Sequence, residues 1–228
     1  MIRHINAYDR AVQSIKADIF QMGKMVSNSL KNALEALAQQ DMGLAQKVIL
    51  GDDKIDDMDY DIENKALELI ALQQPSTRDL RVLSSALRLT KELERIGDYA
   101  VNIAETARIL AGQREYFKPL IDIGRMGTLA MSMLEKGLEA YVEGDLQKAK
   151  EVMLADDRVD ELFNHLFTEL LNIMKTREEH VDQAMYLSLV ARYLERVGDH
   201  SVNLAEMVFY MIKGDRRPFR GHRPSPAD

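Results

Sequence analysis

The chain contains no cysteine among its 228 residues, and it has only five prolines and no tryptophan. The missing cysteine excludes disulfide bonds, thiolate metal sites and a cysteine nucleophile. The sequence also lacks an uninterrupted apolar run of about 18 residues, and its N-terminal MIRHINAYDR has no apolar core of signal-peptide length. We therefore expect a cytoplasmic protein with no transmembrane segment.

Positive charge is in deficit as well. The 30 Lys and Arg residues are outnumbered by 37 Asp and Glu residues, which gives a formal net charge of −7. A nucleic-acid partner usually requires a concentrated basic face, so we expect none. A hydrophobic fraction of 46% and a charged fraction of 29% are typical of a folded, helix-rich chain that can bury a sizeable core.

Two segments of the chain are near copies. Residues 92–105 read ELERIGDYAVNIAE and residues 193–206 read YLERVGDHSVNLAE, with nine of the fourteen aligned positions identical. Upstream, residues 21–57 align with residues 125–161 at a shift of 104, whereas the later motif aligns at a shift of 101. The second copy is thus three residues shorter, and we place the difference in the turn near Pro75. A repeat of this length indicates two similar domains rather than a solenoid.

Each copy is expected to form three long helices, because apolar residues recur at steps of three and four and no segment alternates convincingly with strand period. The expected ranges are about 8–40, 41–72, 76–110, 120–142, 145–174 and 181–212. Short connections make successive helices antiparallel. We therefore predict an all-α fold of two tandem, pseudo-symmetric three-helix bundles, with residues 1–112 and 113–214 as the bundles and residues 215–228 as a disordered tail.

Polar residues mark several of the expected helix starts. Asp41 and its counterpart Asp145 are predicted N-caps. Capping boxes are predicted for the third helix of each copy, at Ser76 with Asp79 and at Thr176 with Glu179.

The repeated motif carries acids and an amide at steps of four, which packing alone does not require. At about 100° per residue, these side chains fall on one flank of the apolar stripe of their helix. In each second helix, a pair of aspartates four residues apart flanks the packing face. Two such acidic rows could meet at the rim of a bundle, and their repulsion would then need a cation, protonation or a basic partner.

Oxygen-only ligand sets suit Mg²⁺, Ca²⁺, Mn²⁺ or iron better than zinc. We therefore predict one site for divalent or trivalent metal ions in each half and leave the element open. The predicted ligands are Asp52, Asp56, Glu94, Asp98 and Asn102 in the first half, and Asp156, Asp160, Glu195, Asp199 and Asn203 in the second.

Two features qualify this prediction. Asp59 and Glu63 extend the acidic row in the first half only, because Phe163 and Phe167 replace them in the second. The alternative is a salt-bridged helix face, in which Arg95 pairs with the acids beside it.

Nothing else in the sequence carries comparable chemistry. There is no Gly-rich phosphate loop, and the five histidines show no ligand spacing. His200 stands where the first copy has Tyr99, which favours a packing or surface role. A metal-dependent phosphohydrolase or redox enzyme remains an alternative function. The missing nucleophile, histidine base and basic phosphate cradle favour a protein that is not an enzyme.

The sequence resembles the PhoU family of bacterial phosphate-transport accessory proteins over about residues 8–213. The resemblance rests on ELERIGD and YLERVGD at corresponding places in the two halves, on GDDKIDD and ADDRVDE, and on QQPSTRDLR. It implies two three-helix bundles with metal ions or clusters, often iron, on surface acids that correspond here to Glu94, Asp98, Glu195 and Asp199. It also implies a negative regulator of the phosphate-starvation response that couples the ATPase subunit of the phosphate ABC transporter to a sensor histidine kinase. We further expect a homodimer.

Overall fold

The computed structural model describes residues 7–73, 75–112 and 115–215. These residues form helices and connecting turns, with no β-strand among them, which confirms the all-α prediction. The elements are α1 (Ala7–Gln39), α2 (Met42–Gly51), α3 (Asp53–Gln73), α4 (Thr77–Ala111), α5 (Ile121–Glu143), α6 (Leu146–Thr176), the 3-10 turn η1 (Glu178–His180) and α7 (Val181–Lys213). The predicted disordered tail lies outside the described residues from position 216 onward.

Three of the predicted helix starts are confirmed. The side chain of Asp41 accepts a hydrogen bond from the backbone N–H of Leu44, and Asp145 caps α6 in the same way. The Ser76 side chain accepts a bond from the N–H of Asp79, so it caps α4. These side chains satisfy backbone donors that a helix leaves free at its first turn.

The predicted capping box at Thr176 is wrong. Thr176 is the last residue of α6, and its hydroxyl donates to the carbonyl of Asn172 in the preceding turn. The turn η1 follows, and α7 starts after His180 without a side-chain cap. The shorter connection in this half leaves no extended N-cap residue of the kind that Ser76 supplies to α4.

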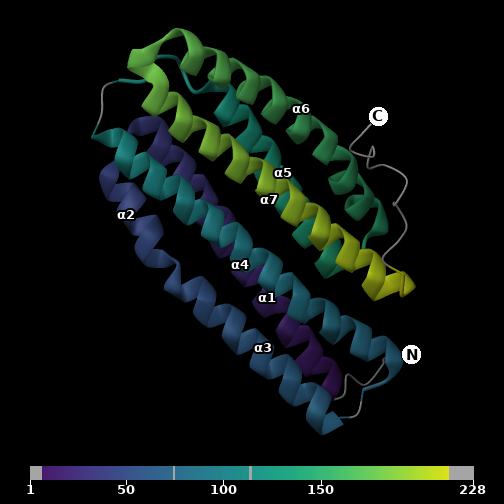
Figure 1. Cartoon of the computed structure of the whole chain (residues 1–228). Coiled ribbons are helices and arrows are strands. Elements are labelled where there is room, and N and C mark those ends of the chain that lie inside the picture. The colour runs from purple at the N-terminus through teal and green to yellow at the C-terminus, as the bar shows by residue number, and fades with distance from the viewer. Residues whose placement is uncertain (1–6, 74, 113–114, 216–228) are drawn as a thin grey trace.

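The second predicted helix of the first half is interrupted. α2 ends at Gly51 and α3 begins at Asp53, whereas α6 runs unbroken through the corresponding position. At the junction, the carbonyl of Asp52 accepts from the N–H groups of both Ile55 and Asp56, at 2.7 and 3.2 Å. This tightening of the backbone changes the course of the chain at a predicted ligand (Figure 1).

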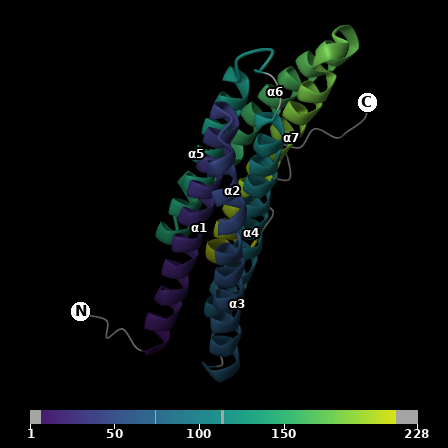
Figure 2. The same cartoon turned by 90° about the vertical axis from the view of Figure 1, so that its left-hand side faces the viewer.

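The helices form two bundles that lie side by side. α1 packs against α2, α3 and α4, and α5 packs against α6 and α7. Across the boundary α4 contacts α7 and α1 contacts α5, so α3, α4, α7 and α6 form one layer with α1 and α5 behind it (Figures 1 and 2).

The two halves are related by a pseudo-twofold arrangement at the α1–α5 contact. A methyl group added at Gly23 would overlap the side chain of Leu138, and one added at Gly127 would overlap that of Leu34. These two pairs correspond to each other at the repeat shift of 104 residues. Glycine thus allows close approach of α1 and α5 at two related points, and the buried apolar residues of both bundles join in one continuous core.

Candidate metal centres

The glycine of each repeated motif makes room for an aspartate of the neighbouring helix. A Cβ atom at Gly97 of α4 would lie 3.4 Å from Oδ1 of Asp52, and one at Gly198 of α7 would lie 3.1 Å from Oδ1 of Asp156. At Gly97 the added Cβ would make an ordinary contact with this carboxylate, whereas at Gly198 a larger residue would push the carboxylate away from the helix that carries the motif acids. Asp52, at the junction of α2 and α3, thus lies against α4, and Asp156 of α6 lies against α7, so each is close to the motif acids of the neighbouring helix.

In the first half, the carboxylates destabilise one another's charged forms. Burial raises the pKa of Asp52 to about 6, and the nearby charges of Asp56, Asp98 and Glu94 contribute to the rise. The pKa of Asp56 is raised by burial and then by Asp98, and that of Glu94 by burial and then by Asp98. A cation would relieve this repulsion.

The second half repeats this arrangement. Burial raises the pKa of Asp156 to about 7, with further contributions from the charges of Asp160, Asp199 and Glu195. Burial followed by the charge of Asp199 raises the pKa of Glu195, against the opposing effect of two arginines. In both halves the aspartate that faces the motif glycine has the most strongly raised pKa of its group.

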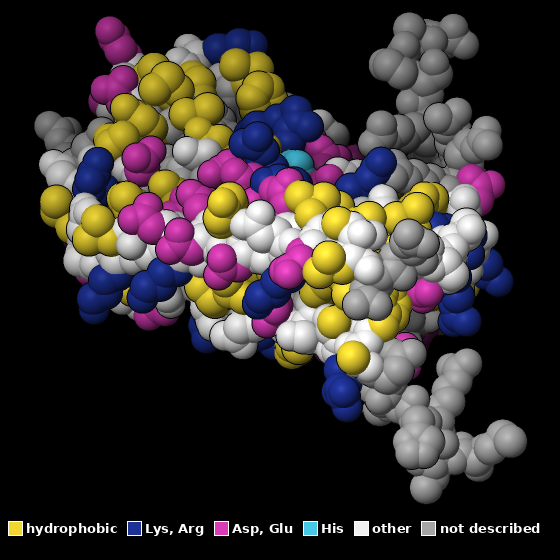
Figure 3. Space-filling model, turned by 90° about the horizontal axis from the view of Figure 1, so that it is seen from below, with side chains coloured by type: hydrophobic (Ala, Val, Ile, Leu, Met, Phe, Trp, Pro, Cys, Tyr) yellow, Lys and Arg dark blue, Asp and Glu magenta, His cyan; other side chains and the backbone are white. Residues whose placement is uncertain are grey.

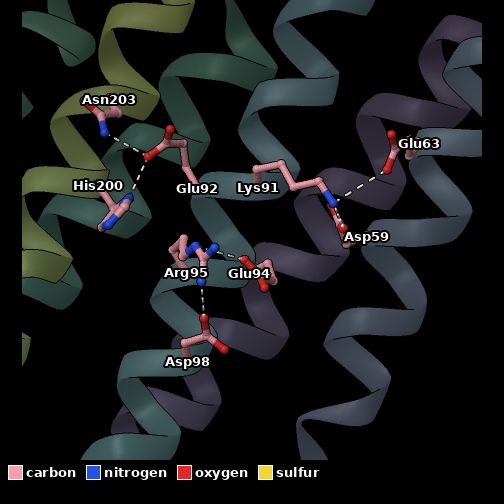
Figure 4. A network of polar contacts seen from close by, with 9 residues as sticks. All are labelled: Asp59, Glu63, Lys91, Glu92, Glu94, Arg95, Asp98, His200 and Asn203. Atoms are coloured by element: carbon pink, nitrogen blue, oxygen red, sulfur yellow. Dashed lines mark hydrogen bonds and ion pairs between the residues drawn. The ribbon is translucent and has the colours of Figure 1, made fainter.

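Arginines of the same helices pair with the motif acids. Arg95 lies 3.0 Å from Asp98 and 3.6 Å from Glu94 (Figure 4), and Arg196 lies 3.1 Å from Asp199. These are contacts of the salt-bridged helix face, the alternative that the sequence also allowed. They leave Asp52, at the junction of α2 and α3, and Asp156 of α6 without an arginine among the causes of their pKa shifts.

The donor set fits a hard cation, although the side chains are not arranged around one. Within residues 7–73, 75–112 and 115–215, no group of three or more His, Asp or Glu side chains converges with the spacing of a metal site. The carboxylates are nevertheless crowded, partly buried and supplied only with oxygen donors, which Mg²⁺, Ca²⁺, Mn²⁺ and iron accept. Rotation of Asp98 and Asp199 away from their arginines would make further oxygens available.

The two predicted asparagine ligands have contacts unlike those of the predicted carboxylate ligands. Nδ2 of Asn203 donates to Oε2 of Glu92 on α4 at 2.8 Å, so this side chain joins the two bundles instead of the acids of its own half. Asn102 is partly buried on α4, and its backbone carbonyl accepts from the hydroxyl of Thr106.

The asymmetry at Asp59 and Glu63 has a structural counterpart. Lys91 of α4 donates to Oδ2 of Asp59 and lies 3.5 Å from Glu63 (Figure 4). Asp59 is 6% exposed, and its Oδ1 has no hydrogen-bond partner. The extra acids of the first half are thus matched by a lysine and do not simply enlarge the predicted metal site.

Sequence reasoning missed a polar contact between the bundles. Nδ1 of His200 lies 2.6 Å from Oε2 of Glu92, the oxygen that Asn203 also contacts (Figure 4). The related pair on the other side of the pseudo-twofold is Tyr99 and Tyr193, which stack with ring centroids 5.9 Å apart. Glu92 and His200 do not recur in the repeat, and comparing the unlike positions of the two copies could have indicated them.

Comparisons with known proteins agree with these observations. A family model described as PhoU domain matches the chain twice, over residues 19–107 and 123–208. A protein of Clostridium acetobutylicum named phosphate-specific transport system accessory protein PhoU homolog is 39% identical over 208 residues, covering 91% of this chain and 94% of the relative. A protein of the same name from Caulobacter vibrioides is 36% identical over 92% of each chain.

Solved structures show the same fold. The crystal structure of PhoU from Pseudomonas aeruginosa superposes with a TM-score of 0.89 at 29% identity, covering 91% of this chain and 100% of the other. The phosphate transport system regulatory protein PhoU from Streptococcus pneumoniae gives a TM-score of 0.85 at 27% identity, covering 91% and 98%. The repeated motifs, the paired three-helix bundles and these matches over nearly the whole length show that the chain belongs to the PhoU family.

Proposed function

We propose that this protein is a cytoplasmic accessory and regulatory protein of phosphate-specific transport. The observation that carries the proposal is the similarity to relatives named for this role, which reaches 39% identity and covers nearly the full length of both chains. Among the described residues, no helix is both long enough and apolar enough to cross a bilayer.

In the proposed role, the protein acts as an adaptor and not as an enzyme. When phosphate is plentiful, it holds a phosphate-sensing histidine kinase and the ATPase subunit of the phosphate ABC transporter in a repressing complex. A rigid double bundle with one continuous core supports such a role, because it can present two fixed surfaces to different partners. The proposed working unit is a homodimer.

The two acidic groups are proposed to bind divalent or trivalent metal ions. Asp52 and Asp56 would hold an ion together with Glu94 and Asp98, and the corresponding acids would do so in the second half. The ion would neutralise carboxylates whose pKa values are raised by burial and mutual repulsion, and it would tie α3 to α4 and α6 to α7. It would stabilise a surface and catalyse no reaction.

The regulatory role is tested by deleting the gene and measuring a phosphate-starvation reporter in high phosphate. We expect the reporter to be derepressed in the deletion strain and repressed again when the wild-type chain is supplied. Normal repression in the deletion strain would contradict the adaptor role. Metal-dependent phosphoester hydrolysis by the purified protein that is lost in Asp98→Ala would favour an enzyme instead.

The metal sites are tested separately, by elemental analysis of protein purified without chelators or a metal-binding tag. We expect the bound metal to fall in Asp52→Asn and in Asp156→Asn, and to be lost in the double variant. Asp157→Asn, at an exposed position of α6 next to the second group, is the matched control. Equal metal content in the double variant and the control would rule out these sites.

A further inference from the structure

An exposed apolar stripe runs along α6 and α7 beyond the acidic group of the second half. Phe167, Leu171, Met185 and Leu189 are 43%, 39%, 43% and 39% exposed, respectively. Phe163 is partly buried and stacks on Phe167 with a centroid distance of 5.7 Å. On each helix these residues follow one another at steps of four, so they share one face. These five residues are called the apolar stripe below.

The first half has no such stripe at the related positions. The repeat shifts of 104 and 101 place Asp59 opposite Phe163, Glu63 opposite Phe167, Ser84 opposite Met185 and Arg88 opposite Leu189, and only Leu67 keeps an apolar residue, opposite Leu171. There Lys91 pairs with both acids across α3 and α4. The same three-helix bundle thus forms with charged residues at these positions in the first half and with apolar residues in the second. Folding of the bundle therefore does not require the apolar stripe.

The stripe lies where α6 and α7 project beyond the other helices (Figure 2). Viewed from below, hydrophobic side chains gather on this projecting end of the molecule, and basic and acidic side chains follow toward the middle (Figure 3). A partner could reach this surface without displacing any described helix.

The size of the stripe favours one short helix as its occupant. Phe, Tyr and Trp side chains offer roughly 150–250 Å² each, and Leu and Met are not larger, so four residues about 40% exposed leave an apolar area on the order of 300 Å². A stable dimer buries about 800 Å² on each partner, so the stripe alone is too small for a second copy. An amphipathic helix presents a single row of apolar residues at i, i+3 or i+4 and i+7, so a small apolar surface of this kind can accommodate it.

Charge specifies the ends of that helix. Acids border the stripe at both ends: Asp156, Asp160, Glu195 and Asp199 at the inner end, and Glu178, Glu179 and Asp182 at the turn between α6 and α7. Arg192 and Arg196 offset part of the inner charge, and Lys175 and Arg177 part of the outer charge. In the metal-free protein both ends therefore remain acidic by formal charge. A helix with basic residues on both sides of its apolar positions would therefore be attracted to this surface.

We propose that the apolar stripe of α6 and α7 is a docking site for an amphipathic helix of another protein, with apolar residues at i, i+3 or i+4 and i+7 and with Lys or Arg at each end. This docking is independent of the role in phosphate transport, because it follows from the contrast between the two halves. It gives the second half a binding surface that the first half lacks.

The test uses the full chain and a fluorescent model peptide of 18 residues, with leucines at i, i+4 and i+7 and lysines at both ends. Binding is followed by fluorescence anisotropy in the presence of a metal chelator, at low and high salt. We expect saturable binding that weakens with salt, and at least a tenfold rise in Kd for Leu171→Asp and for Leu189→Asp. Leu67→Asp is the matched control, because it places the same change at the related, 48% exposed leucine of the first half and should leave Kd unchanged.

Three results would overturn the proposal. A peptide of the same composition with scrambled periodicity could bind equally well, which would indicate attraction by charge alone. Leu67→Asp could weaken binding as much as Leu171→Asp, which would remove the distinction between the halves. Sedimentation could show that Leu171→Asp separates a wild-type dimer, which would assign the stripe to contact between copies. A folded circular dichroism spectrum for each variant excludes unfolding as the cause of weaker binding. Normal repression of the phosphate-starvation reporter in the deletion strain would contradict the proposed function but would not affect the peptide-binding test.

Discussion

In the first half, Lys91 of α4 pairs with Asp59 and Glu63 of α3, whereas in the second half Arg192, at the related position of α7, pairs with Glu195 of its own helix at 2.6 Å. Phe163 stands where Asp59 would be, so Arg192 has no acid at that position to reach and lies over the aromatic ring instead, 5.7 Å from its centroid. Where the second copy has phenylalanine in place of these acids, the cation on the neighbouring helix thus has a different partner.

The acidic groups of the two halves also differ, in the burial of their carboxylates. The Glu195 side chain is 13% exposed, against 24% for Glu94. Burial is the main cause of the raised pKa in both halves, and it raises the pKa of Asp156 to about 7 but that of Asp52 only to about 6. The duplication kept the set of carboxylates and changed their solvation, so the two sites should differ in strength.

The largest expected effect is that of Lys91→Ala. It leaves Asp59, 6% exposed, without its cation, and an unpaired buried charge is costly. Because the lysine itself is half exposed, we expect a loss of about 2 kcal/mol in the free energy of unfolding, partly restored by added Mg²⁺ or Mn²⁺. Urea denaturation with and without the metal measures both. Arg192→Ala should cost less, because Arg196 also lies near Glu195; an equal or larger loss would break the comparison.

The next effect concerns the facing aspartates and pH. A raised pKa means that the folded protein holds the proton more tightly than the unfolded chain, where the Asp pKa is about 3.9. The free energy of unfolding should therefore fall as pH rises from about 4 through 6 for Asp52 and through 7 for Asp156.

Replacing either aspartate by asparagine should remove this penalty. After allowance for solvent screening, we expect Asp156→Asn to stabilise the metal-free protein at pH 8 by roughly 1–2 kcal/mol, more than Asp52→Asn, and both gains to vanish near pH 4. Chemical denaturation in chelator at the two pH values provides the measurement. A larger gain for Asp52→Asn would reverse the assigned order of burial.

The contact between the bundles gives a smaller effect. Glu92→Gln and His200→Ala should each lower the free energy of unfolding by about 1 kcal/mol, and the double variant should lose less than the sum, because the two side chains share one interaction. Tyr99→Leu with Tyr193→Leu forms the matched cycle on the other side of the pseudo-twofold. Additive losses for Glu92 and His200 would show that their contact contributes nothing.

The smallest effect distinguishes the two motif glycines. A Cβ at Gly97 would meet Asp52 at an ordinary contact distance of 3.4 Å, but one at Gly198 would lie only 3.1 Å from Asp156. Alanine favours a helix over glycine by up to about 1 kcal/mol, so Gly97→Ala should be neutral or stabilising. Gly198→Ala should gain less, because Asp156 must move. Thermal unfolding of the two variants decides this, and equal shifts in Tm would show that Asp156 moves freely.

Much of the fold could be predicted, because it depends on local chemistry. Apolar spacing predicted the long helices, Asp41 and Asp145 were identified as caps from their residue type and position, and Ser76 was identified from its spacing to Asp79. The errors lay where a residue that suits one local role takes a different role in the folded chain. Thr176 could bond back into α6 instead of capping α7, and the aspartate row could not show that the backbone tightens at Asp52.

The candidate sites were predicted in part. Spacing placed Glu94 with Asp98 on one helix face, and the repeat indicated the facing aspartates. Neither spacing nor the repeat could show that the Asn203 side chain hydrogen-bonds to Glu92 or that Lys91 pairs with the extra acids of the first half. Both outcomes depend on which side chain of another helix lies nearest, and helical periodicity carries no such information.

The sequence by itself determined that the chain is duplicated, helical and acidic along two related rows, because repetition, periodicity and charge are properties of residue order. Only the tertiary structure decided that Asp52 and Asp156 each lie against a motif glycine, that Glu92 and His200 join the bundles, and that Phe167 and Leu189 share an exposed surface. These relations arise when separate helices pack at a particular rotation and height. Burial and electrostatic neighbours, and with them the difference between the halves, follow from that packing.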